Sequence, residues 1–170
     1  MDAAYPNRDQ HAARRHEFRQ MLTAMVESAA ERDGIELYLS THAVLGIPVP
    51  ASLLVTAASG DPEHPGPLPV DTIADSLRGA HGRAAEIDTV TLPSGPAVRC
   101  RRTEHTEETK GLGQPEDQPN TVLDFYLPVP NSGAWLLLTF STPMPVPEIA
   151  DAQVEMFEAI AASLRWTYTS

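Results

Sequence analysis

The sequence predicts an α+β domain in which a largely antiparallel sheet of about six strands is flanked by an N-terminal and a C-terminal helix. Three observations support this prediction. Two apolar strand candidates at 121–127 and 134–141 flank a short turn, a segment of helical period follows Pro147, and the remaining strand candidates stand next to one another along the chain. Adjacent strands exclude the regular βαβ winding that a parallel sheet requires.

The two apolar strands form the centre of the expected sheet. Strand 121–127 alternates, with Leu123 and Phe125 on one face and Asp124 and Tyr126 on the other, as in a strand with one buried face. Strand 134–141 is apolar on both faces, which predicts a central, covered position. The turn at 128–133 contains residues that adopt a positive φ, which favours an antiparallel hairpin.

A C-terminal helix follows. The prolines between 143 and 147 end the sheet because they lack backbone donors, and Pro147 suits a first helical turn. We expect Leu138 and Phe157 to meet in the core and Glu158 to face solvent. One apolar stripe at three- and four-residue spacing is expected to face the sheet; it contains Ile149, Ala152, Met156, Phe157, Ile160 and Leu164.

The other elements are assigned in chain order. Residues 1–7 are a loose tail, and 8–170 form one α+β domain. A helix over 8–33 ends at Gly34, and strands follow at 35–40 and 53–58. Asp71 is the expected N-cap of a short helix that Gly79 closes. Strands 86–92 and 97–103 form a hairpin, and the polar stretch near 104–120 is expected to be a mobile loop.

Composition limits the classes of function. The formal net charge of −11 argues against nucleic acid or an anionic membrane as the main partner. A single cysteine, Cys100, allows no intrachain disulfide, and no apolar run has the length of a membrane span. The charged N-terminus lacks a signal peptide's apolar segment. We therefore expect a cytoplasmic protein without a cofactor.

Part of the chain resembles a known group of proteins. Residues 125–166, with the pattern FYLPVP…LLLTFSTP…FEAIAASLRW, resemble uncharacterised actinobacterial proteins. The order of elements is similar to that of the Mog1/PsbP-like fold, an α/β/α sandwich around an antiparallel sheet. That resemblance implies a non-enzymatic binding module, since the known members mostly act in GTPase regulation or photosystem assembly. No functional residue of those proteins matches a motif in this sequence.

The residue types that usually carry catalysis or bind metals form no convincing constellation. The six histidines have neither the spacing nor the companion ligands of a zinc site. Cys100 and His105 could be a nucleophile and its base, but a strand would hold them about 16 Å apart. Cys100 is expected to be a small buried hydrophobe.

Two charged features are the candidate sites. Arg99 and Arg101 project from one face of strand 97–103 and could grip a carboxylate or phosphate. The alternative is internal pairing with carboxylates on neighbouring strands, namely Glu86, Asp88 or Asp124. The second feature is an acidic run that could dock a basic partner or simply be solvated; it comprises Glu104, Glu107, Glu108, Glu116 and Asp117.

Taken together, the sequence predicts a protein-binding or assembly accessory that performs no catalysis and has an unidentified protein partner. One alternative is a small-ligand binder or small enzyme with an anion pocket formed by Arg99 and Arg101. The other is a structural homo-oligomer, such as a homodimer, built through the N-terminal helix or a free sheet edge.

Overall fold

A computed structural model of the chain describes residues 34–40, 50–59, 66, 68–104 and 119–167, with scattered positions between 20 and 48. Its centre is a six-stranded antiparallel sheet with strand order β1-β4-β8-β7-β6-β5. Two very short strands, β2 (Ala43–Val44) and β3 (Ile47–Pro48), pair with each other. The strands of the main sheet are β1 (Gly34–Leu39), β4 (Ser52–Ala58), β5 (Ala85–Leu92), β6 (Gly95–Glu104), β7 (Asn120–Pro128) and β8 (Trp135–Thr142).

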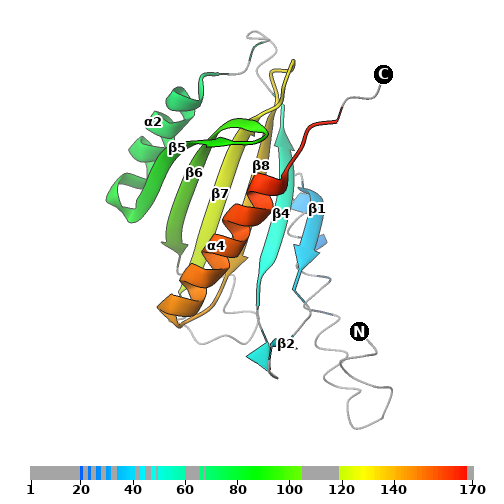
Figure 1. The fold of residues 1–170 in the computed structure, drawn as a ribbon, viewed down its shortest axis with the longest axis vertical. Helices are drawn as coiled ribbons and strands as arrows, with labels where there is room; N and C mark the ends of the chain where they lie inside the picture. The colour runs from blue at the N-terminus through cyan, green and yellow to red at the C-terminus, as the bar shows by residue number, and fades with distance from the viewer. Residues whose placement is uncertain are drawn as a thin grey trace.

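Two helices cover opposite faces of this sheet. Helix α4 (Pro147–Ser163) crosses one face over β7 and β8, and helix α2 (Val70–His81) packs against β5 and β6 (Figure 1). Successive side chains of β6 point to opposite faces of the sheet. Ala97 therefore belongs to the core under α4, whereas Val98 and Cys100 belong to the core under α2. The architecture is thus the predicted α+β class with an antiparallel sheet.

The strands agree with the prediction, but the short helix does not. All six strands of the main sheet match predicted segments, and Asn131 in the β7–β8 turn has a positive φ of 57°. The expected start of α2 at Asp71 and end at Gly79 were both wrong, since Pro69 caps the helix and Gly82 ends it. Gly82 has a φ of 57°, a backbone conformation that residues with a side chain rarely adopt and that ends the helix, whereas Gly79 lies within the helix.

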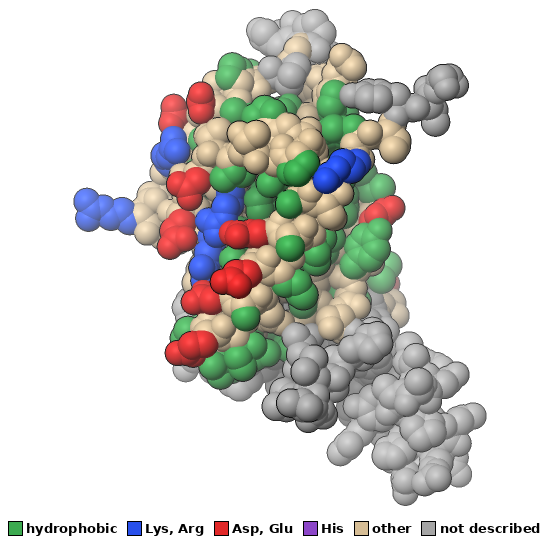
Figure 2. Space-filling view, viewed as in Figure 1, with side chains coloured by type: hydrophobic (Ala, Val, Ile, Leu, Met, Phe, Trp, Pro, Cys, Tyr) green, Lys and Arg blue, Asp and Glu red, His purple; other side chains and the backbone are tan. Residues whose placement is uncertain are grey.

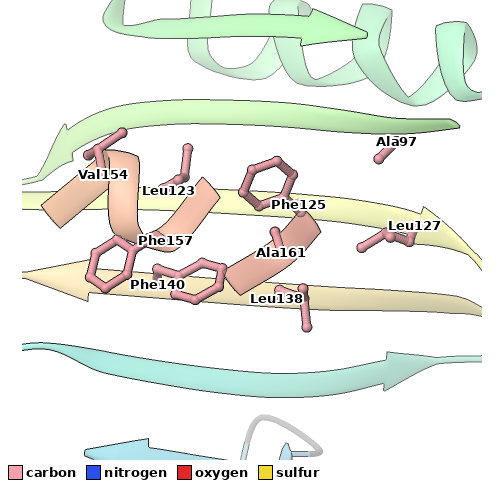
Figure 3. Close-up of a cluster of buried hydrophobic side chains, with 9 residues drawn as sticks. All are labelled: Ala97, Leu123, Phe125, Leu127, Leu138, Phe140, Val154, Phe157 and Ala161. Atoms are coloured by element: carbon pink, nitrogen blue, oxygen red, sulfur yellow. The ribbon is translucent and has the colours of Figure 1, made fainter. Parts of the chain in front are cut away.

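The larger core lies between α4 and the sheet. Phe140 stacks on Phe157 with ring centroids 4.8 Å apart, and Phe125 meets Phe140 edge-on at 6.3 Å (Figure 3). Leu138 and Phe157 are both buried members of this cluster, which confirms their expected place in one core. The cluster consists of Ala97, Leu123, Phe125, Leu127, Leu138, Phe140, Val154, Phe157 and Ala161.

Helix α4 is rotated relative to the prediction. Its buried residues are Ala150, Gln153, Val154, Phe157 and Ala161. Of the predicted stripe, Phe157 is buried, but Ile149, Met156 and Ile160 are 44%, 45% and 42% exposed. Ala152 is exposed as well, so the assignment of these four residues to the face that meets the sheet was wrong.

The small alanines explain this rotation. Ala150 and Ala161 are almost fully buried, so the backbone of α4 approaches the aromatic core along their side of the helix. The buried hydroxyl of Thr142 on β8 strengthens this contact, because it donates its one proton to the Pro50 carbonyl at 2.9 Å while the side-chain amide of Gln153 contacts the same hydroxyl oxygen. A polar tether and small side chains thus determine which face of α4 meets the sheet.

The predicted helix over 8–33 lies almost wholly outside the described residues. The described positions between 20 and 31 are helical and exposed, and among them Val26 is 56% exposed.

Candidate functional site

The two predicted anion-binding arginines lie beside α4, and both are paired. Arg99 Nε donates to Glu158 Oε1 at 2.8 Å, and its Nη1 lies 3.8 Å from Asp88 Oδ2. Arg101 donates to Asp151. The structure thus brings the two guanidinium groups to one face of the sheet, where two carboxylates of α4 already neutralise them.

These contacts correct two expectations. Glu158 does not point freely into solvent, because it bonds Arg99, whose side chain is only 15% exposed. Among the internal partners considered for the arginines, Asp88 contacts Arg99 and Asp124 contacts Arg102. The main partners of Arg99 and Arg101 come from α4, because these side chains project towards the helix that crosses the same face.

Arg102 belongs to a separate buried charge cluster on the opposite face. It donates to Asp124, which is 2% exposed, and to Glu104 Oε1 at 2.6 Å. Burial alone would lower the pKa of Arg102, but Asp124 and Glu104 raise it, so the guanidinium stays charged. Burial, followed by the charge of Asp124, raises the pKa of Tyr126 to about 12. These contacts indicate a structural ion-pair cluster.

The thiol near this cluster is buried. Cys100 is 0% exposed, as predicted, and burial together with the charge of Asp124 raises its pKa, although Arg102 opposes that shift. A thiol held in its protonated form is a poor nucleophile. His105, its postulated base, lies outside the described residues. Within the part of the chain that is described, no three histidine, cysteine or acidic side chains are grouped closely enough to hold a metal ion.

The acidic loop is described only at its start. Glu104 is the last residue of β6 and bonds Arg102. Glu107, Glu108, Glu116 and Asp117 lie outside the described residues, so the partner-binding role of this run stays a prediction.

An open apolar surface lies on the other side of α4. There a groove of about 500 Å³ runs between α4 and the strands β8, β4 and β1. In Figure 2, acidic and basic side chains gather along one side of α4, whereas hydrophobic side chains predominate on the side over β4 and β1. The groove is lined by Glu36, Tyr38, Leu39, Ser40, Ala51, Ser52, Leu53, Val55, Leu136, Leu138, Phe140, Met156, Phe157, Ile160, Ser163 and Leu164.

The shape of this groove follows from the placement of α4. The helix covers β7 and β8, so β4 and β1 at the end of the sheet are left beside it without a covering helix among the described elements. Met156 and Ile160 form the helical wall, and Tyr38, which is 55% exposed, stands on the opposite rim. The groove is therefore open to solvent and apolar along its length.

Several polar groups of the groove already have partners. Tyr38 Oη donates to Glu36 Oε2 at 2.5 Å, and this bond and the charge of Glu36 raise the pKa of Tyr38. Ser163 Oγ donates to the Ile160 carbonyl at 2.6 Å, and Ser52 Oγ lies 2.7 Å from Ser141 Oγ. Glu36 is the one charged residue among those that line the groove. The arrangement thus suits an apolar occupant better than the stabilisation of a charged reaction centre.

Sequence reasoning found the residues of the helical wall but gave them the wrong role. The signal that could have revealed the groove is the width of the apolar surface on α4. Ala150, Val154 and Ala161 add a second apolar row beside Met156 and Ile160. A helix with two apolar rows can bury one row against a sheet and leave the other at the surface.

Comparisons with known proteins support the fold. No family model matches the chain, and no curated protein sequence matches it. A search of solved structures finds PA94, a protein of unknown function from Pseudomonas aeruginosa suggested to be a regulator. The TM-score is 0.50 at 13% sequence identity, and the match covers 79% of this chain and 83% of PA94. At this identity the similarity concerns the fold alone. No helix among the described residues has the length and apolarity needed to cross a membrane.

Proposed function

We propose that this chain is a non-catalytic binding module whose groove receives an apolar segment of a protein partner. The observation that carries the proposal is the exposed apolar wall of α4 beside strands that no helix among the described elements covers. Met156 and Ile160 are 45% and 42% exposed and face the groove. Removing apolar surface from water gains about 25 cal/mol per Å², so an apolar segment laid between α4 and β1 has a favourable site.

The chemistry of the lining favours binding over catalysis. An enzyme pocket usually combines apolar walls with polar groups that converge on the substrate and have perturbed pKa values. Here Tyr38 bonds Glu36 at the rim, and Ser163 bonds its own helix. The open side along β1 also suits a chain segment, which must enter and leave the groove.

Two similarities point in the same direction. The resemblance to Mog1/PsbP-like proteins implies a non-enzymatic binding role, and a regulatory function, as suggested for PA94, would also act through a partner. Neither similarity identifies that partner. The Mog1/PsbP-like assignment, the actinobacterial origin and the cytoplasmic location stay predictions.

The anion-pocket alternative requires the arginines to exchange partners. A small anion would have to compete with Glu158 for Arg99 and with Asp151 for Arg101. Internal pairing of this kind supports a structural role for the two arginines, which connect β6 to α4.

The test is affinity capture from the native cell with single charged substitutions on α4. Met156→Glu and Ile160→Glu place a carboxylate in the groove, whereas Ile149→Glu places one at an equally exposed position that does not line it. Because a charge is costly to bury without a partner, the two groove variants should lose captured protein about tenfold or more. Ile149→Glu should retain it.

Thermal melts of the same variants verify that all three stay folded. Equal capture by all the variants would refute the groove as the binding site, and so would an equal loss in all three. If instead the groove variants release a bound apolar small molecule detected by mass spectrometry, while protein capture is unchanged, the groove receives that small molecule and the proposal of a protein partner is refuted.

A further inference from the structure

The edge strand β1 has outward backbone groups that no strand among the described residues pairs. It is the terminal strand of the sheet and pairs with β4 alone among the described strands. Ser40 donates its backbone N–H to the Ala51 carbonyl at 2.9 Å, so the Ser40 backbone points towards β4. Since backbone groups alternate in direction along a strand, those of Tyr38 also point to β4, and those of Leu37 and Leu39 point away from it.

The devices that protect an edge are confined to the start of β1, where a charge at Glu36 and an irregularity in pairing occur, and they leave Leu37–Leu39 unprotected. Natural edges carry lysine, proline or inward-pointing charges that prevent pairing with another chain. Strand β1 has the sequence GIELYL, with one charge at Glu36, and Ile35 and Tyr38 are 59% and 55% exposed. An irregularity in its pairing is confined to Gly34–Glu36 and leaves the rest regular. The opposite edge, β5, is different, because it carries Glu86 and Asp88 and contacts α2.

The sequence of β1 is complementary to itself in one antiparallel register. When two copies pair about Leu37, the outward backbone groups of Leu37 in each copy can exchange two hydrogen bonds. On the groove face, Glu36 then lies opposite Tyr38 of the partner copy, and Tyr38 lies opposite Glu36 of the partner copy. On the other face Leu37 meets its own equivalent. The neighbouring register that pairs Glu36 with itself would place two carboxylates directly opposite, which is unfavourable.

We propose that β1 is a homodimerisation edge through which two copies join their sheets in antiparallel fashion, centred on Leu37. The twofold axis runs perpendicular to the sheet, so both α4 helices lie on the same side of the joined sheet. The two grooves then adjoin across the paired β1 strands, and Tyr38 of each copy stands at the junction. The occupant of the edge is thus a second copy of this chain, independent of what the grooves receive.

The experiment measures self-association of the full chain by sedimentation over a range of concentrations. Wild type should show a reversible monomer–dimer equilibrium. Tyr38→Glu places a carboxylate opposite Glu36 of the partner copy twice per dimer, and should weaken self-association about tenfold or more. Tyr38→Lys removes the same phenol but faces Glu36 with an opposite charge, and should retain the dimer. Glu36→Lys combined with Tyr38→Glu should restore it.

Ile149→Glu controls for net charge, since it adds the same charge at an exposed position far from β1 along the chain. A wild-type chain that stays monomeric at every concentration would overturn the proposal. The register would be wrong if Tyr38→Lys disrupted the dimer as strongly as Tyr38→Glu, or if the double variant failed to restore it. A monomeric wild type whose Tyr38→Glu variant loses a native protein partner would also overturn the proposal, because Tyr38 lines the groove that receives such a partner.

Discussion

Replacement of Phe157 by alanine tests the orientation of α4 against the sheet. Phe157 is 3% exposed and stacks on Phe140 at a centroid distance of 4.8 Å. Truncating a buried phenylalanine costs about 3–5 kcal/mol, from lost burial and from the cavity left behind. For a chain of 170 residues, each kcal/mol lowers the melting temperature by roughly 2–4 °C. Phe157→Ala should therefore lower it by roughly 6–20 °C.

The adjacent residue provides a matched control. Met156 is 45% exposed and faces the open groove, so Met156→Ala should cost about 1 kcal/mol or less, as surface substitutions usually do. The assay is urea unfolding followed by circular dichroism, with free energies extrapolated to water. If Met156→Ala were as destabilising as Phe157→Ala, the orientation of α4 described above would be wrong.

Three further predictions concern the buried charge cluster and its neighbours. Asp124→Ala should lower the free energy of unfolding, measured in urea, by about 3 kcal/mol. This is the lower end of the range for breaking a buried ion pair, because Arg102 keeps its bond to Glu104. Cys100 should react with a thiol reagent slowly in the native protein and rapidly in denaturant, since it is fully buried with a raised pKa. Because burial and the charge of Asp124 raise the pKa of Tyr126 to about 12, its phenol ionises later in the folded chain than in the unfolded chain, where the pKa is about 10. The free energy of unfolding should therefore fall as pH rises from about 10 to 12, and less so in Tyr126→Phe.

Each of these three predictions would be contradicted by a specific result. A neutral effect of Asp124→Ala would mean that the pair contributes little beyond its own desolvation cost. Fast native labelling of Cys100 would reopen its role as a nucleophile. If Tyr126→Phe lost as much stability between about pH 10 and 12 as the wild type does, groups other than Tyr126 would cause that loss. Cys100 would be the next group to test.

The sequence was sufficient to predict the strands of the sheet. Leu123, Phe125 and Leu138 lie where alternation placed them, and the turn at Asn131 has the positive φ that an antiparallel hairpin needs. These features depend on neighbouring residues along the chain, where periodicity carries the information.

The helix contacts could not be predicted in the same way. Apolar periodicity does not distinguish the row of α4 that meets the sheet from the row that lines the groove, because Val154 and Met156 are both apolar. The choice depends on tertiary fit, with Ala150 and Ala161 permitting close approach and Gln153 bonding Thr142. The spacing of apolar residues within a strand does not reveal contacts between α4 and the sheet either, since those contacts join residues that are distant in the sequence.

The candidate site illustrates the same limit. Arg99 and Arg101 were correctly placed on one strand face, but their main partners, Glu158 and Asp151, are 59 and 50 residues away in the sequence. Only the position of α4 over β7 and β8, next to β6, brings these charges together. The groove was likewise invisible because it is formed by three strands and a helix that meet only in the folded chain.

Site-specific photo-crosslinking tests the binding groove most directly. A photoreactive residue would replace Ile160 in the groove and, in a separate variant, Ile149, which is equally exposed but does not line it. Irradiation in the native cell followed by mass spectrometry would identify what each position contacts. The groove account predicts that position 160 crosslinks to an apolar segment of another protein and that position 149 does not. Crosslinking from position 149 alone, or from neither position, would contradict it.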